Sequence, residues 1–134
     1  MKANAGTPLA KKLGIASGDR VALLGAPEAF RSHLQTLPDS VKLLRSTRKP
    51  LDIAVLFVTR RSELLRRLPT TKRSMSDEGQ VWIAWPKGTS GVVTDLRDAD
   101  VREIGFAHGM VENKVTSLDD MWSGVRFVLR HATR

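Results

Sequence analysis

The run Leu51–Thr59, LDIAVLFVT, constrains the fold more than any other stretch of the chain. It is almost continuously apolar, rich in β-branched residues and flanked by charged segments. A run of this kind is typical of a strand that is buried on both faces, as in a parallel sheet. Two further apolar runs, Val21–Gly25 and Val81–Trp85, have the same character. The three runs therefore predict parallel central strands of one sheet.

Segments with helical periodicity separate these runs, and the whole pattern predicts an α/β fold. Helices are predicted at residues 8–14, 27–37, 60–73 and 94–108, the last capped by Thr94 or Asp95; further strands are predicted at 41–44, 111–117 and 124–129, and a turn at 76–79. The last two strands are joined by the short segment Leu118–Met121, so they should form an antiparallel hairpin. Short loops and right-handed connections then give a mostly parallel sheet with helices on both faces and an antiparallel edge.

Local signals mark several helix ends. Thr7 is the expected N-cap of the first helix, Pro8 its first residue and Gly14 its end. Gly109 is the expected end of the last helix. Pro69 lies inside the arginine-rich segment, where it either breaks the helix or begins a second turn.

The composition is that of a soluble globular domain. A chain of 134 residues can bury one core, and the absence of cysteine excludes disulfides and thiolate metal sites. No apolar run approaches the roughly 20 residues that span a bilayer, which argues against a membrane partner. The N-terminus lacks the apolar middle of a secretory signal. We therefore expect a cytoplasmic protein.

The positive charge is concentrated in one segment. The chain carries a net charge of +8, and residues 60–73, with six basic residues and one acid, supply +5 of it. The candidate nucleic-acid-binding residues are Arg60, Arg61, Arg66, Arg67, Lys72 and Arg73. Aromatic residues make up only 5% of the chain and tyrosine is absent, so a stacking platform for single strands is hard to assemble. The segment is therefore interpreted as a solvated helix face, with weak, salt-sensitive phosphate binding as the alternative.

The junction WPKGTSG, Trp85–Gly91, ends an apolar run at a proline. Proline cannot donate to a strand ladder, so the strand should end at Pro86. Ligands of parallel sheets bind beyond the carboxyl ends of the strands, which predicts a site where the loops of neighbouring strands meet. The candidate ligand-binding residues are Gly25, Ala26, Pro27, Thr59, Trp85, Pro86, Lys87, Ser90 and Gly91. Lysine, serine and exposed glycine amides suit a phosphate or a carboxylate, and an ordinary loop is the alternative.

The two tryptophans of this strand should face opposite sides of the sheet. Trp82 and Trp85 are three positions apart, and successive side chains of a strand alternate between faces. Both are expected in the core, with Trp85 the better candidate for a half-exposed position beside the site.

No catalytic residue and no metal site are predicted. His33, His108 and His131 lack metal-ligand spacing. No serine lies in a nucleophile elbow, and no glycine-rich phosphate loop is present. The acids at residues 98, 100 and 103 suit the positive end of the last helix.

The element order resembles the fold of class I S-adenosylmethionine-dependent methyltransferases, a Rossmann-like sheet that ends in an antiparallel pair. The run Leu51–Phe57, the helix after it and the segment Asp77–Pro86 resemble the fourth strand, its helix and the fifth strand of that fold. The strands from Val111 and at Trp122–Leu129 resemble the closing hairpin. The resemblance covers residues 18–131 and implies a single Rossmann-like domain over residues 1–134, in which residues 1–17 are an N-terminal helical extension.

The chain departs from that family at the cofactor site that the resemblance implies. The family has a glycine-rich turn after its first strand, whereas Gly25 is followed here by Ala26 and Pro27. Its second strand ends in an acid that binds the ribose hydroxyls, whereas this strand is followed by Arg45. One strand of the fold also has no room between residues 46 and 50. We therefore expect no cofactor, and S-adenosylmethionine in particular is disfavoured.

The chain is also similar to an uncharacterised family of small bacterial proteins. The shared motifs are Leu24–Pro27 (LGAP), Phe57–Thr59 (FVT), Trp85–Lys87 (WPK) with Ser90–Gly91, and Trp122–Phe127 (WSGVRF). This resemblance implies no activity. The sequence thus favours a non-catalytic Rossmann-like module that binds a small anionic ligand or a protein partner at the carboxyl ends of its strands. The alternative is a methyltransferase or other transferase acting on an acidic substrate such as nucleic acid, and the oligomeric state stays open.

Overall fold

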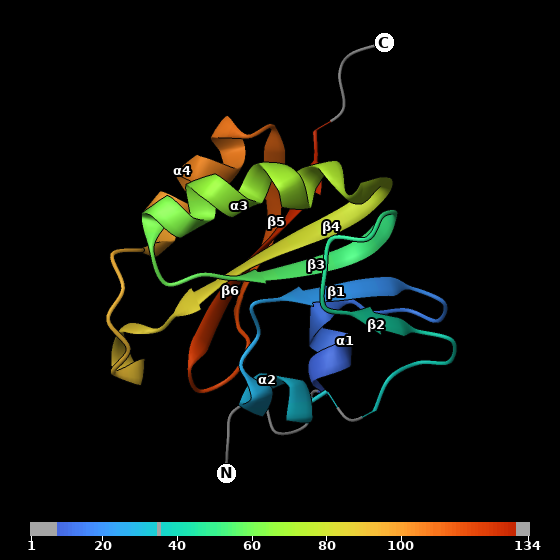
Figure 1. Cartoon of the computed structure of the whole chain (residues 1–134). Coiled ribbons are helices and arrows are strands. Elements are labelled where there is room, and N and C mark those ends of the chain that lie inside the picture. Colours follow the sequence, from blue (N-terminus) through green and yellow to red (C-terminus); the bar gives the residue numbers. More distant parts are fainter. Residues whose placement is uncertain (1–7, 35, 131–134) are drawn as a thin grey trace.

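The computed structural model describes residues 8–34 and 36–130, and six strands form one sheet in it (Figure 1). The strands are β1 (Arg20–Leu24), β2 (Lys42–Leu44), β3 (Leu51–Phe57), β4 (Met75–Pro86), β5 (Met110–Ser117) and β6 (Trp122–Leu129). Their order across the sheet is β2-β1-β3-β4-β6-β5. The first four strands of that order are parallel, whereas β6 is antiparallel to both β4 and β5. The predicted parallel centre and closing antiparallel hairpin are confirmed.

Helices cover both faces of the sheet, as predicted. They are α1 (Leu9–Leu13), α2 (Glu28–Ser32), α3 (Arg61–Arg73), the 3₁₀ turn η1 (Gly88–Ser90) and α4 (Asp98–Ala107). α3 and α4 lie on one face, and α1 and α2 lie on the other (Figure 1). In the described part of the chain, no helix is long and apolar enough to cross a membrane.

Alternate residues of the central strands form two cores, one on each face. On β3, Ile53 and Val55 pack under α1 and α2, while Leu56 packs under α3 and α4. Trp82 is completely buried on the α1/α2 face, where its indole Nε1 donates to the Leu13 carbonyl at 3.0 Å. Trp85 belongs to the opposite core, which confirms that the two tryptophans face opposite sides. The prediction of a half-exposed Trp85 is wrong, because α3 and α4 cover it and leave 5% of it exposed.

Two predicted helices are shorter than expected. α2 ends at Ser32, well before residue 37, and α4 begins at Asp98. Thr94 and Asp95 do not cap α4. The Thr94 hydroxyl donates to the Thr59 carbonyl at 2.6 Å, and the Asp95 carboxylate accepts from the Arg61 amide at 2.7 Å. These side chains therefore tie the loop before α4 to the start of α3.

The predicted turn at residues 76–79 is wrong, because β4 already begins at Met75. The pairing of β3 with β4 passes from Leu51↔Met75 to Ile53↔Gln80, so the extra residues of β4 form a bulge. A Cβ on Gly79 would lie 2.8 Å from the Met75 methyl carbon and 3.0 Å from the Leu51 carbonyl oxygen. The Ser76 carbonyl oxygen would also lie 3.0 Å from that Cβ, so the glycine marks a crowded point inside the bulge, between the start of β4 and the first residue of β3.

The predicted helix ends at the two glycines are confirmed. Gly14 and Gly109 adopt φ angles of +81° and +82°, which glycine reaches without strain. Pro8 is the N-cap of α1 and not its first helical residue, and Thr7 lies outside the described residues. α3 continues through Pro69 without a break.

Candidate functional site

The carboxyl ends of β1, β3 and β4 lie at the same edge of the sheet, because these strands are parallel and adjacent. The predicted ligand-binding residues lie at or beyond these ends. Gly25–Pro27 come after β1, Thr59 comes shortly after β3, and Pro86 is the last residue of β4, as predicted. Lys87 begins the loop beyond it.

Around Gly25, the structure brings together residues of β1, β3 and α3. Gly25 has a φ of +76°, and a Cβ there would lie 3.1 Å from Nη1 of Arg67 and 3.3 Å from the Phe57 carbonyl oxygen. Glu63 accepts a hydrogen bond from the Thr59 amide at 3.1 Å, and its other carboxylate oxygen lies 3.8 Å from Nη1 of Arg67. The turn after β1 and the end of β3 thus share the charged pair Glu63–Arg67.

The second half of the predicted site, Trp85–Gly91, contacts the β5–β6 hairpin. Pro86 pairs with Trp122, and the Lys87 amide donates to the Met121 carbonyl at 2.9 Å. Burial is the main cause that lowers the pKa of Lys12 on α1, and the positive charge of Lys87 is the second cause. A contact of Lys87 with Gly25 or Thr59 stays a prediction.

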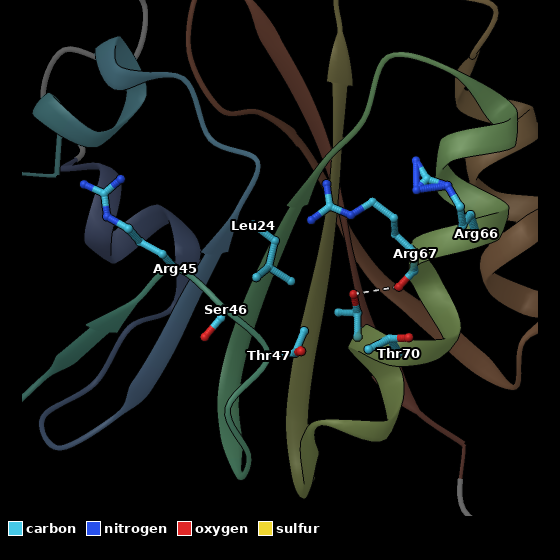
Figure 2. Close-up of a pocket in the computed structure, with 8 residues that line it drawn as sticks. Leu24, Arg45, Ser46, Thr47, Arg66, Arg67 and Thr70 are labelled. Atoms are coloured by element: carbon cyan, nitrogen blue, oxygen red, sulfur yellow. Dashed lines mark hydrogen bonds between the residues drawn. The ribbon is translucent and has the colours of Figure 1, made fainter.

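A cleft of about 400 Å³ lies between α3 and the connection from β2 to β3 (Figure 2). Its lining residues are Leu24, Arg45, Ser46, Thr47, Arg66, Arg67, Thr70 and Thr71. Leu24, the last residue of β1, supplies the apolar part of this lining. In Figure 2, Arg67 extends from α3 toward Leu24, whereas the Arg45 side chain extends away along the opposite wall. The volume is within the range of small-molecule sites, about 300–1,000 Å³.

The lining of this cleft is strongly positive. It includes three arginines, and none of the described residues that line it is acidic. Arg67 faces Glu63 only at 3.8 Å, which is longer than a hydrogen bond. Burial is the main cause that lowers the pKa of Arg31, whose Nη2 donates to the Leu23 carbonyl at 3.0 Å, and the positive charge of Arg45 is the second cause. Arg31 and Arg45 therefore repel each other, and an anion bound at Arg45 would relieve that repulsion.

The cations of the basic segment do not form one continuous surface on α3. Arg61 lies 3.4 Å from the Asp100 carboxylate, and the Lys72 ammonium donates to the His108 carbonyl at 2.5 Å, so both point toward α4. Arg66 and Arg67 line the cleft on the other side of the helix. Arg60 and Arg73 are exposed. Nucleic-acid binding by these residues stays a prediction.

Sequence reasoning missed most of this cleft. Arg45 was noticed only as a cation in the place of an acid, and the hydroxyl residues at positions 46, 47 and 70 carried no signal. These residues and those of α3 line the same cleft because residues 45–50 connect β2 directly to β3 and form no further strand. The connection and α3 then form the two walls of the cleft (Figure 2).

Two of the histidines and Asp119 have structural contacts. Within residues 8–34 and 36–130, no three histidine or acidic side chains group as metal ligands would. His108 Nδ1 lies 2.8 Å from the Ile104 carbonyl, and His33 lies 4.0 Å from the Asp119 carboxylate. That carboxylate accepts from the amides of Met121 and Trp122, which stabilises the hairpin turn. His131 lies outside the described residues.

Most of the sequence matches the model of a protein family. The model of the family described as "Protein of unknown function (DUF3052)" matches residues 10–131. The chain belongs to the DUF3052 family. This confirms the resemblance to an uncharacterised family, and no curated protein matches the chain.

Solved structures of methyltransferases share the fold of this DUF3052 chain. A SAM-dependent methyltransferase from Aquifex aeolicus has a TM-score of 0.63 at 17% identity, with 87% of this chain and 85% of that chain covered. A putative type 11 methyltransferase from Sulfolobus solfataricus has a TM-score of 0.62 at 14% identity, with 94% and 92% covered. A DhpI–SAH complex has a TM-score of 0.65 at 12% identity, with 96% and 85% covered. At these identities the likeness shows the fold alone, and it confirms the predicted methyltransferase-like fold.

Proposed function

We propose that this chain is a non-catalytic binding module of methyltransferase-like fold, which takes a small anionic ligand at the carboxyl ends of its parallel strands. The observation that carries the proposal is the arginine-lined cleft beside the turn at Gly25. Guanidinium groups present several N–H donors in a planar fork and bind carboxylate or phosphate oxygens bidentately. A protein partner with an acidic side chain would use the same chemistry, and it is the second occupant to test.

The lining of the cleft favours binding over catalysis. Arginine stays protonated at every physiological pH, and serine and threonine hydroxyls do not titrate near neutrality. The described lining therefore supplies hydrogen-bond donors and positive charge, but no group that could take and return a proton at pH 7. Such a set can orient and neutralise an anion without reacting with it.

The same residues do not fit S-adenosylmethionine. Nη1 of Arg67 lies 3.1 Å from the Cβ position of Gly25, so this side chain occupies space beside the turn that the methyltransferase resemblance assigns to the methionine part of the cofactor. Arg45 follows β2, where the ribose hydroxyls would need an acidic acceptor. The methyltransferase alternative rests on the shared fold, and a melting screen that includes S-adenosylmethionine tests it.

A thermal melting screen tests the proposal. The purified chain is melted with phosphate, dicarboxylates, nucleotides, S-adenosylmethionine, its demethylated product, short nucleic acids and acidic peptides. A ligand at 100 times its dissociation constant adds about 2.7 kcal/mol to the free energy of unfolding, which raises the melting temperature of a domain of this size by roughly 10 °C. We expect a small anion to give such a rise and the cofactor to give none.

The control variants place the effect in the cleft. Arg67→Gln should abolish the rise, whereas Lys11→Gln, an exposed charge change on α1 at the opposite face, should retain it. Stabilisation by S-adenosylmethionine, or a rise that survives Arg67→Gln, would contradict the proposal.

A further inference from the structure

The arginines of the cleft come from two separate elements. Arg66 and Arg67 belong to α3, and Arg45 belongs to the connection between β2 and β3. In the view of Figure 2 the Arg67 guanidinium lies between those of Arg45 and Arg66, and the Arg45 side chain extends away from Arg67, so Arg45 has to turn inward to share a ligand with it. An anion of one phosphate group that contacts Arg67 leaves the other two cations without a partner. A ligand with several adjacent charges can engage more of them.

The two outer arginines are available to a ligand. In the described part of the chain, Arg45 and Arg66 form no ion pair and no side-chain hydrogen bond, and both are exposed. Arg67 is intermediate in exposure, and its contact with Glu63 is too long to be a hydrogen bond. Long, exposed arginine side chains can swing toward a multivalent anion, and each charge-assisted hydrogen bond then adds affinity.

The rest of the lining selects phosphate oxygens over a nucleobase. Ser46 and Thr47 supply hydroxyl groups, and the Thr70 hydroxyl accepts from Nη2 of Arg73 at 3.2 Å and keeps its own proton to donate. The Thr71 hydroxyl already donates to the Arg67 carbonyl at 2.9 Å. The described lining contains no aromatic side chain on which a base could stack. Its apolar part is Leu24.

The arrangement also argues against nucleic acid as the ligand. The cations of the cleft line one concave site beside α3. Two other cations of α3, Arg61 and Lys72, already contact groups of the α4 segment. A polymer backbone needs a continuous row of cations on a surface that it can follow.

We propose that the cleft binds a soluble oligophosphate, that is, two or more adjacent phosphate groups held by Arg67 in the middle and by Arg45 and Arg66 on either side. This inference rests on the proposed function and names its ligand class. The phosphate chain is recognised and the group attached to it is not, so a free oligophosphate and the phosphate chain of a nucleotide are equivalent ligands.

Titration calorimetry at a fixed ionic strength of about 0.15 M tests this inference with the full chain, since screening by salt removes weak surface binding. The probes, without magnesium, are inorganic phosphate, pyrophosphate, tripolyphosphate, AMP, ATP and a short DNA duplex. We expect tripolyphosphate and ATP to bind with affinities within about threefold of each other, and phosphate and AMP to bind at least about tenfold more weakly.

The variants Arg45→Gln and Arg66→Gln should each weaken tripolyphosphate binding about tenfold, which is the loss of one charge-assisted contact. Arg102→Gln is the matched control, because Arg102 is on α4 and pairs with Glu112 of β5 at 3.3 Å, away from the cleft. It should change the affinity less than twofold. Melting curves of each variant without ligand establish that it is folded.

The outcomes separate this inference from the proposed function. If a dicarboxylate or a single phosphate stabilises the chain through Arg67 and tripolyphosphate binds no better, the oligophosphate inference is wrong and the anion-binding function stands. If no small anion binds, both are wrong. The inference is also overturned if duplex DNA binds more tightly per phosphate group than tripolyphosphate does. It is likewise overturned if Arg45→Gln and Arg66→Gln both leave the affinity for tripolyphosphate unchanged.

Discussion

Replacing Gly25 with alanine tests the crowded turn at the candidate site. Gly25 has a φ of +76°, a conformation that costs an L residue about 1–2 kcal/mol. Alanine also restricts the unfolded chain, which returns about 0.4–1 kcal/mol, so the backbone alone should lower the free energy of unfolding by about 1 kcal/mol. The new Cβ would then lie 3.3 Å from the Phe57 carbonyl oxygen and 3.1 Å from Nη1 of Arg67.

These two contacts differ in how easily they relax. The Arg67 guanidinium is the end of a flexible side chain and can move, whereas the Phe57 carbonyl belongs to a central strand. Crowding against fixed atoms costs about 1–3 kcal/mol. We expect Gly25→Ala to lower the free energy of unfolding by about 2–4 kcal/mol, or roughly 7–14 °C in melting temperature for a domain of this length. Displacement of Arg67 should also weaken anion binding.

The chain contains two matched controls for this substitution. Gly18 and Gly91 have φ angles of +79° and +83°, and a Cβ at either position meets no atom within 4 Å. Gly18→Ala and Gly91→Ala therefore measure the backbone cost alone, about 1 kcal/mol each. The assay is urea unfolding of all three variants, followed by an anion titration of Gly25→Ala with Gly18→Ala as its control. Equal losses in the three would refute the argument that Phe57 and Arg67 crowd the turn.

Three further substitutions test the packing and the electrostatics of the fold. Gly105→Ala should lower the free energy of unfolding by about 1–3 kcal/mol in urea, because the new Cβ would lie 2.3 Å from the buried Phe127 ring. This loss is expected although alanine is the better helix former, and an increase in stability would contradict this packing. Trp82→Phe should lower the free energy of unfolding by about 1–3 kcal/mol, since it removes the donor to the Leu13 carbonyl. Hydrogen exchange should then show faster opening of α1, and unchanged exchange rates would count against the contact. The pKa of Lys12 is lowered by burial, then by Lys87, so the folded chain binds fewer protons than the unfolded chain between that lowered pKa and 10.5. The free energy of unfolding should therefore gain a positive contribution as the pH rises through this window, and the Lys12→Met variant should lack that contribution. Identical pH profiles of stability for the parent chain and the variant would contradict this assignment.

The sequence by itself determined the elements whose signals are local. Three apolar runs predicted the parallel strands because a strand buried on both faces must be apolar at consecutive positions. β4 ends at Pro86 and α1 ends at Gly14, as predicted. Proline fixes φ and lacks an amide proton, and glycine reaches positive φ without strain, whatever their neighbours are. The element order was enough to predict the methyltransferase-like fold.

Only the tertiary structure decided what depends on partners far along the chain. The side chains of Thr94 and Asp95 found acceptors and donors near the start of α3, more than 30 positions away, and so did not cap the nearby helix. Trp85 is buried because α3 and α4 cover it. The cleft brings Arg45 and Arg67 to one place because the connection after β2 and the helix after β3 meet beside β1. No periodicity or local spacing encodes such a meeting, since it depends on how the packed elements lie relative to one another in space.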